Sequence, residues 1–431
     1  MRRMDAYTCC MNLKLAVTLL LAALTIGAQA QTEQKPKPTF EQALVEARSP
    51  LVLADGKFSG AGADVLSAAV AESRFVMLGE DHITHEIPQF AGALCAMMHP
   101  DAYAVEAGPY ATQFVSGLLH DPDRVARMAA RNKANPNNMA FLDIREENDL
   151  AAKCATASHN SHFALWGLDQ EFLGAAATLL EAMAASHPGP RSLAAIAAAE
   201  AKDRAATAQA LGSGDYGKLF LLASTDADIQ ALQGAIDADG SDGARDELHE
   251  LAESRRIYRL NGEGSAESNL ARAELLKLHF LANYVPFKQQ TPAPRILFKF
   301  GDNHTGKGFS YTRELNLGNF IAELAASEQA KSLHMFVLGA RGMHFTMAGF
   351  GKPMGQTPFV MADDPDYKWL APAVANMAPQ QAGQAGAVMT LYDLRKLRYR
   401  GLDLSRDWEH VVYSYDLCIL MPELTVGSAI Q

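Results

Sequence analysis

The feature that most constrains the fold is a set of six short, continuous apolar runs, each ending in glycine or polar residues. Such runs are typical of parallel strands buried on both faces, because strands with one wet face alternate apolar and polar residues. Stretches of helical composition separate the runs. This alternation predicts an α/β fold, a mostly parallel sheet with helices on both faces. The predicted strands lie at 74–80, 102–108, 163–169, 295–301, 333–339 and 417–423.

One long helical region interrupts the alternation, at about 174–284, and is rich in Ala, Leu, Glu and Arg. It predicts a large helical insertion or cap on the sheet domain. Within it, the sequence DADGSDGARDEL at 237–248 only partly resembles a calcium-binding loop. Asp242 stands where that loop needs glycine, and Leu248 stands where it needs glutamate. We therefore expect this segment to join two helices.

The first thirty residues have the pattern of a secretory signal peptide. Basic residues precede an apolar run at 15–26, and the segment ends in Ala-Gln-Ala at 28–30. The apolar run is short for a membrane span, which favours cleavage over anchoring. We expect an exported protein, periplasmic or secreted, with no stable membrane anchor after cleavage. The predicted organisation is a signal peptide at 1–30, a polar linker at 31–40 and the α/β domain at 41–431.

Charge and composition narrow the class of partner. The chain carries a formal net charge of −11, and nucleic-acid binding needs basic clusters that contact phosphates. The one basic cluster, at 394–400, is short and is interpreted as a solvated face. We therefore expect a small-molecule substrate or ligand and no nucleic acid. Composition leaves the oligomeric state open.

Three cysteines remain after signal removal: Cys95, Cys154 and Cys418. An odd and sparse count argues against a disulfide framework. One bridge can form, but the expectation is three buried thiols.

Four of the predicted strands end in residues that can carry out acid–base chemistry. The carboxyl ends of parallel strands share one edge of a sheet, and ligands bind in the crevice there. Glu106 lies in an otherwise apolar run, and a buried carboxylate needs a partner or becomes protonated, which favours an active role. Asp81 and Asp169 have structural alternatives, as a helix cap and a strand terminator. The candidate residues are Glu80, His82, His85 and Glu86 after the first strand, Glu106 in the second, Asp169 after the third, and Asn303 and His304 after the fourth.

Motifs of well-known hydrolase types are absent from the sequence. It has no G-x-S-x-G turn and no H-E-x-x-H helix. Two kinds of chemistry remain for His82, Glu106 and His304. They could bind a divalent metal, or a His–Glu pair could activate water, with the imidazole taking the proton and the carboxylate fixing its tautomer. A second histidine or an arginine would then steady the oxyanion, which suits ester or amide hydrolysis.

The segment FGDNHTGKG at 300–308 also contains the spacing of a phosphate-binding loop, G-x-x-x-x-G-K. Gly308, however, stands where that loop needs a Ser or Thr to bind magnesium. The glycines have a simpler use in a tight turn at a strand end. We interpret the segment as a loop that presents Asn303 and His304.

These motifs together resemble those of a known superfamily. LGEDHITHEIPQF at 78–90, AVEAG at 104–108, WGLDQEF at 166–172 and FGDNHTGKG at 300–308 resemble the erythromycin-esterase-like proteins, which are grouped with ChaN-like haem-uptake and Tiki/TraB proteins. RAELLKLHFLANY at 272–284 resembles the family's helix that carries an arginine to the site, with Arg272 as the match.

The resemblance implies roles for individual residues. His82 would be the general base for water, with Glu80 and Glu106 as its orienting carboxylates. His304 and Arg272 would contact the substrate. His82 follows Gly79 by three residues, as in the Tiki/TraB and ChaN-like branches, whereas the esterases have a spacing of four. Three functions therefore stay open: an ester or amide hydrolase, a haem- or porphyrin-binding protein without catalysis, and a metal-dependent peptidase.

Overall fold

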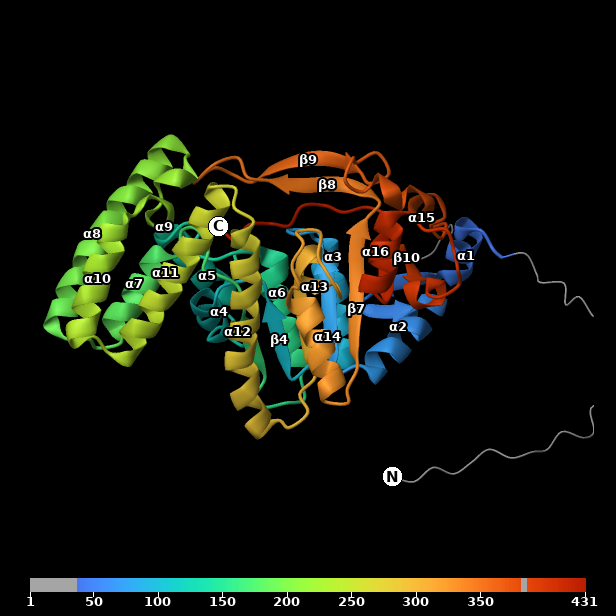
Figure 1. The fold of residues 1–431 in the computed structure, drawn as a ribbon, viewed down its shortest axis with the longest axis horizontal. Helices are drawn as coiled ribbons and strands as arrows, with labels where there is room; N and C mark the ends of the chain where they lie inside the picture. Colours follow the sequence, from blue (N-terminus) through green and yellow to red (C-terminus); the bar gives the residue numbers. More distant parts are fainter. Residues whose placement is uncertain (1–36, 381–385) are drawn as a thin grey trace, which may run out of the picture.

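The computed structural model describes residues 37–380 and 386–431 (Figure 1), so the predicted signal peptide lies outside the described residues. The described chain forms a nine-stranded sheet in the order β2-β1-β10-β11-β7-β3-β6-β4-β5 and a separate two-stranded hairpin, β8-β9. Helices lie on both faces of the large sheet, so the predicted fold class is confirmed.

Six neighbouring strands make up the parallel part of the sheet, and each coincides with a predicted strand. Their register places Glu80 beside Gly301 and Val105 beside both Lys299 and Gly167. The carboxyl ends of β3, β4, β5 and β6 therefore meet at one edge. The strands are β3 (Phe75–Glu80), β4 (Ala102–Val105), β5 (Ala164–Gly167), β6 (Ile296–Gly301), β7 (Ser332–Gly339) and β11 (Leu417–Met421).

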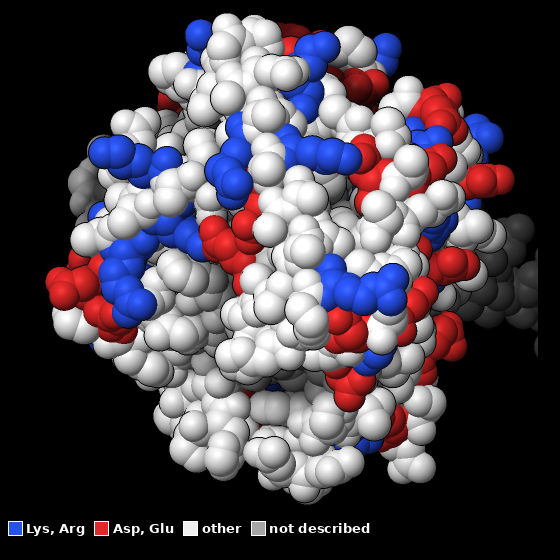
Figure 2. Space-filling view, turned by 90° about the vertical axis from the view of Figure 1, so that its left-hand side faces the viewer, with Lys and Arg blue, Asp and Glu red and all other residues white. Residues whose placement is uncertain are grey.

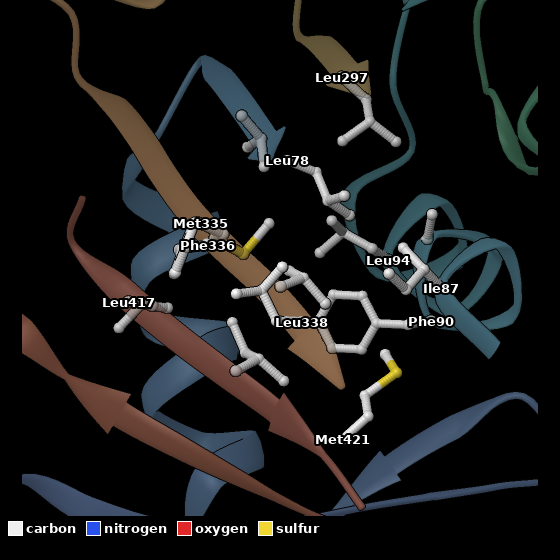
Figure 3. Packing of buried hydrophobic residues seen from close by; sticks show 14 of the residues in the cluster. Leu78, Ile87, Phe90, Leu94, Leu297, Met335, Phe336, Leu338, Leu417 and Met421 are labelled. Atoms are coloured by element: carbon white, nitrogen blue, oxygen red, sulfur yellow. The ribbon is translucent and has the colours of Figure 1, made fainter. Parts of the chain in front are cut away.

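Alternate residues of each parallel strand enter two different cores, which explains why the runs are continuously apolar. In β3, Phe75 and Met77 pack with α12 (Glu267–Gln290) and α14 (Leu317–Ser327). Leu78 points to the other face, where it packs near Phe90 of α3 (Figure 3). The remaining helices of the sheet domain are α1 (Phe40–Ala47), α2 (Ala61–Glu72), α3 (Glu86–Met98), α4 (Pro109–Ser116), α5 (Arg124–Ala134), α6 (Arg145–Ala157), α13 (Asp302–Thr305), α15 (Ala371–Ala375) and α16 (Arg406–Ser414).

Three antiparallel strands extend the sheet and were not predicted. β10 (Ala387–Asp393) pairs with β11 and with β1 (Arg48–Ala54), and β2 (Lys57–Ser59) forms the outer edge. β1 carries Pro50, which removes a backbone donor. The strand tolerates it because β2 pairs with β1 only from Val52 onward. The proline and the mixed burial of β1 hid this strand from a search for continuous apolar runs.

The long helical region forms a bundle that extends one end of the sheet (Figure 1). The bundle has its own core, which includes Leu180, Ile196, Ile236 and Leu248. The segment with the partial calcium-loop pattern spans a joint between two helices, as predicted: α10 ends at Asp239 and α11 begins at Asp242. The helices are α7 (Ala176–Ala185), α8 (Pro190–Ser213), α9 (Phe220–Ala223), α10 (Asp226–Asp239), α11 (Asp242–Gly262) and α12.

A hairpin of β8 (Arg341–Thr346) and β9 (Gly355–Val360) connects the two ends of the molecule across one edge of the sheet (Figure 1). Its tip is anchored on the bundle, since Phe350 is fully buried with Ala210 and Leu219, and its backbone N–H donates to the Gly214 carbonyl at 3.0 Å. The sequence did not predict this hairpin, because its strands are largely exposed.

The cysteines do not match the expectation of three thiols. Cys95 of α3 and Cys154 of α6 form a disulfide that closes a separation of 59 residues, while Cys418 is a buried free thiol. The sequence missed the bridge because only the packing of α3 against α6 brings these two cysteines together.

The surface and the helices bear on the class of partner. Figure 2 shows the bundle end of the molecule, where acidic and basic side chains are interspersed without a field of one sign. Within the described part of the chain, no helix combines the length and the apolar character needed to cross a membrane.

Candidate functional site

The centre of the site is the imidazole of His82, which lies between two carboxylates. Its Nδ1 is 3.1 Å from Oε1 of Glu80, and its Nε2 is 3.4 Å from Oε2 of Glu106. Phe141 stacks on the ring, with centroids 4.3 Å apart and planes inclined by 17°. The ring remains 30% exposed while both carboxylates are buried. The arrangement fixes the ring orientation and leaves part of the imidazole accessible to a ligand.

The two carboxylates change the charge of His82. Burial by itself would lower the pKa of His82, but Glu106 and Glu80 outweigh burial and raise it from 6.5 to about 10. At neutral pH the ring is therefore an imidazolium. This bears directly on the role predicted from the sequence, because a general base must be deprotonated when it meets the substrate.

Lys299 balances the charge of Glu80 from below. It lies in β6, is buried, and donates to Oε1 of Glu80 and, at 2.6 Å, to Oε1 of Glu147. Burial lowers the pKa of Lys299, but Glu147 and Glu80 outweigh it, so the net pKa is raised. Burial raises the pKa of Glu147 to about 7 against the opposing effect of Lys299. Two acids and one base thus form a buried network under His82.

Glu106 is the most heavily bonded carboxylate of the cluster. Its Oε1 accepts from Nη2 of Arg272 at 2.6 Å, and its Oε2 accepts from the backbone N–H of Gly301 at 2.6 Å. Burial opposes ionisation, but His82, His304 and Arg272 outweigh burial and hold the pKa of Glu106 well below its usual range. Glu106 is therefore ionised throughout the physiological pH range.

Arg272 links the second and third strand ends. Its Nε donates to Oδ1 of Asp169 at 2.9 Å, and its Nη2 donates to both Asp169 and Glu106. Burial opposes the charged guanidinium, but Asp169 and Glu106 outweigh it and raise the pKa of Arg272. A guanidinium suits this position, because its planar fork can serve two carboxylates at once.

His304 completes the cluster from α13, the one-turn helix that replaces the predicted loop. Its Nε2 is 3.5 Å from Oε1 of Glu106. Its Nδ1, like Oδ1 of the adjacent Asn303, is buried without a hydrogen-bond partner among the described residues. A Cβ on Gly301 would lie 2.7 Å from Nε2 of His82, so only glycine lets the α13 backbone approach the ring.

The structure brings most of the predicted site residues together but leaves two outside. Glu80, His82, Glu106, Asp169, Arg272 and His304 form one cluster, and Asn303 lies beside it. His85 and Glu86 do not reach it, because α3 begins there and turns them toward the carboxyl-terminal segment. His85 Nδ1 is 3.0 Å from Glu146, and Glu86 accepts from the backbone N–H of Thr425 at 2.8 Å.

Two further predictions from sequence have direct answers in the contacts. Asp81 does not cap α3, whose N-cap is His85; its Oδ2 instead lies 3.0 Å from Nε2 of His344 on the hairpin. Lys307, the lysine of the phosphate-loop spacing, donates to Asp416 at 2.7 Å. It is therefore occupied by an ion pair, in agreement with the interpretation against a phosphate loop.

The cluster was tested for a fit to a metal. A metal ion needs lone pairs at about 2.0 to 2.2 Å from several ligands, but both oxygens of Glu106 already accept short hydrogen bonds. The described residues contain no group of three or more His, Cys, Asp or Glu arranged to hold a metal ion. His82, Glu106 and His304 as placed do not fit a metal centre.

Sequence reasoning missed three contributors. Lys299 had a signal, since it is the single charged residue in the run at 296–301, just as Glu106 is in its own run. Glu147 and Phe141 had none. They come from α6 and from the segment before it, and only the packing of these against the sheet places them at the site.

A cavity of about 240 Å³, here called the side pocket, adjoins the cluster. Phe141 stacks on His82 and also lines the side pocket, as do Asp169 and Arg272. The other walls come from the segment after β5, the end of α11 and the start of α12. They are lined by Ala140, Gln170, Phe172, Ile257, Tyr258, Asn261, Ser268 and Asn269.

Comparison with solved structures identifies the fold. A histidine-to-asparagine mutant of the erythromycin esterase EreC, in its open conformation, superposes with a TM-score of 0.53 at 14% identity, covering 85% of this chain and 95% of that one. The chain shares its fold with erythromycin esterase. A Bacillus cereus protein matches with a TM-score of 0.55 at 11% identity, covering 91% of this chain and 100% of its own.

A third solved structure, a succinoglycan biosynthesis protein, has a TM-score of 0.55 at 11% identity and covers 90% of this chain and 97% of that one. No family model and no curated protein matches the sequence. The fold that the sequence resemblance implied is confirmed, and at these identities the likeness concerns the fold alone.

Proposed function

We propose that this protein is an exported hydrolase that cleaves an ester or amide by adding water, with His82 as the proton-transferring group. The observation that carries the proposal is the position of His82: a partly exposed imidazole between two buried carboxylates, at the carboxyl edge of a parallel sheet. His304 and Arg272 flank Glu106 and would contact the substrate. Likeness to the erythromycin esterase fold supports a hydrolase.

The direction of proton transfer depends on the pKa of His82. In hydrolysis the water oxygen bonds to the carbonyl carbon, one water proton leaves, and the departing oxygen or nitrogen takes up a proton. A base role for His82 requires its neutral form, so kcat/KM would rise with pH toward about 10. An acid role requires the imidazolium, so kcat/KM would fall above about 10. Both roles pass one proton through the same ring.

The two alternative functions gain less support. A metal-dependent peptidase conflicts with the occupied oxygens of Glu106. A haem-binding protein would need a large cavity at the site. The side pocket holds about 240 Å³, which is below the roughly 300 to 1,000 Å³ of pockets for drug-sized ligands. No contact within the described cluster favours a porphyrin.

Export is part of the proposal. It is motivated by the signal-like sequence at 1–30 and supported by the Cys95–Cys154 disulfide, because such bonds persist mainly in oxidising compartments outside the cytosol.

The test is a broad ester and amide panel with purified wild-type, His82→Ala and His304→Ala proteins. We expect hydrolysis of at least one panel member, with kcat/KM reduced about 100-fold or more by His82→Ala. His85→Ala is the matched control, because His85 lies next to the motif but outside the cluster. Equal activity in wild type and both cluster variants would refute the proposal.

A further inference from the structure

The side pocket has a lining that differs from the charged cluster beside it. Four uncharged hydrogen-bonding side chains enter it from three segments, namely Gln170, Tyr258, Asn261 and Asn269. Its only charged walls are Asp169 and Arg272, which are paired with each other. A charged ligand group would therefore meet one unfavourable charge for each favourable one. The lining favours a neutral, polar occupant.

Several polar groups of the side pocket have no partner in the protein. Gln170 is only 8% exposed, and its Oε1 is buried without a hydrogen-bond partner among residues 37–380 and 386–431. A buried acceptor without a partner costs about 1 to 3 kcal/mol. Over the same described ranges, the amides of Asn261 and Asn269 make no side-chain hydrogen bond, although both face the pocket. These groups are available to a ligand.

The chemistry of the lining narrows the ligand further. Each side-chain amide offers both a donor and an acceptor, and a hydroxyl can answer either one. Phe141 and Phe172 add apolar faces, which suit the carbon skeleton of a ring. The volume of about 240 Å³ accommodates one ring rather than a chain of rings. A single hydroxylated ring meets all three conditions.

The position connects the side pocket to the proposed chemistry. Phe141 forms one wall of the pocket, and its ring centroid lies 4.3 Å from that of His82. We propose that the side pocket binds a neutral, hydroxyl-rich ring of the substrate, of the monosaccharide type, next to the bond to be cleaved. This inference rests on the proposed hydrolase function. The substrate class would then be an acylated sugar or polyol.

The first experiment compares two esters that share one acyl group and one ring skeleton. One is a methyl 6-O-acetyl-hexopyranoside, in gluco, galacto and manno forms, and the other is tetrahydropyran-2-ylmethyl acetate, which lacks the hydroxyls. We expect kcat/KM to favour at least one sugar ester by about 10- to 100-fold, because a site built to bind hydroxyls rejects the analogue without them. Equal kcat/KM for all four esters would overturn the inference and leave the hydrolase function standing.

The second experiment assigns the preference to the side pocket. Asn269→Leu keeps the side-chain size and removes both hydrogen-bonding atoms, and we expect it to lower the sugar-to-deoxy ratio of kcat/KM about tenfold. Gln290→Leu, at the exposed far end of the same helix, is the control and should leave that ratio unchanged. Far-ultraviolet circular dichroism verifies that both variants fold. A ratio that Asn269→Leu leaves unchanged would overturn the assignment.

A binding measurement separates this inference from the hydrolase proposal. The His82→Ala protein is titrated with the methyl hexopyranosides and followed by ligand-observed NMR, with tetrahydropyran-2-methanol as the deoxy probe. Saturable sugar binding that Asn269→Leu weakens would support the side pocket even if no ester were hydrolysed. Absence of sugar binding in this protein, together with hydrolysis that does not distinguish the esters, would refute the side pocket alone.

Discussion

The pKa of His82 gives the sharpest test of the site geometry. Glu106 and Glu80 raise it to about 10, about 3.5 pH units above the ordinary 6.5. At about 1.36 kcal/mol per pH unit, this corresponds to roughly 5 kcal/mol of preference for the protonated ring. Because the ring is 30% exposed, water screens part of the attraction, and we expect about 2 to 3 kcal/mol of it to appear as stability.

The perturbation is Glu106→Gln, which removes the carboxylate that raises the pKa most while preserving its shape. An opposite charge at this distance shifts a pKa by about 1 to 3 units, so we expect the pKa of His82 to fall by about 1.5 to 2 units. Glu80→Gln should lower it by about 1 unit. Glu86→Gln is the control, because Glu86 contacts Thr425 and lies outside the cluster.

The assay is an NMR titration of the imidazole Cε1–H signals from pH 5 to 11, with the His82 signal identified by its loss in His82→Gln. Stability should follow the same equilibrium. The folded pKa lies above the unfolded value, so stabilisation by His82 is complete below about pH 6.5 and is lost as the pH rises toward 10. The stability difference between wild type and His82→Gln should shrink over that range. A wild-type pKa within half a unit of 6.5 would refute the reasoning.

Three other predictions concern the supports of the site. Arg272→Ala leaves Glu106 and Asp169 buried without their cation, so urea unfolding should show a loss of about 2 to 4 kcal/mol, with Arg272→Lys losing less; equal stability of wild type and both variants would contradict the ion-pair geometry. Replacing Cys95 and Cys154 together by alanine opens a crosslink across 59 residues and should cost about 4 kcal/mol in a denaturant titration, and a stability that matches the wild type would show that the bond does not form. Incubation with EDTA followed by gel filtration should leave hydrolytic activity unchanged, because the oxygens of Glu106 are occupied; activity that is lost on chelation and restored by a transition metal would support the peptidase alternative instead.

The accuracy of the sequence reasoning followed the kind of signal that each element carries. All six parallel strands were predicted, because burial on both faces requires a continuous apolar run. The strands β1, β8, β9 and β10 were missed. β8 and β9 are exposed, and β1 contains Pro50 and mixed burial. Their pairing depends on partners distant in sequence, which no local pattern encodes.

The same distinction applies to the site. Proximity in sequence suggested His85 and Glu86 along with His82, but three residues beyond His82 the start of α3 turns these side chains away. Arg272 came only from the family resemblance, since an arginine on a helix has no local mark of function. Asp169 could be placed because it ends a strand, yet its pairing with Arg272 could not.

The sequence by itself determined the parallel sheet and the identity of the residues at its carboxyl edge, because strand burial and chain polarity are local properties. Only the tertiary structure decided the charge of those residues. Glu80 and Glu106 bracket His82, while Lys299 and Glu147 sit beneath it. The protonation of a buried group depends on all charges within a few ångströms, whatever their distance along the chain. The disulfide and the side pocket follow the same rule, since each is assembled from segments that only packing brings together.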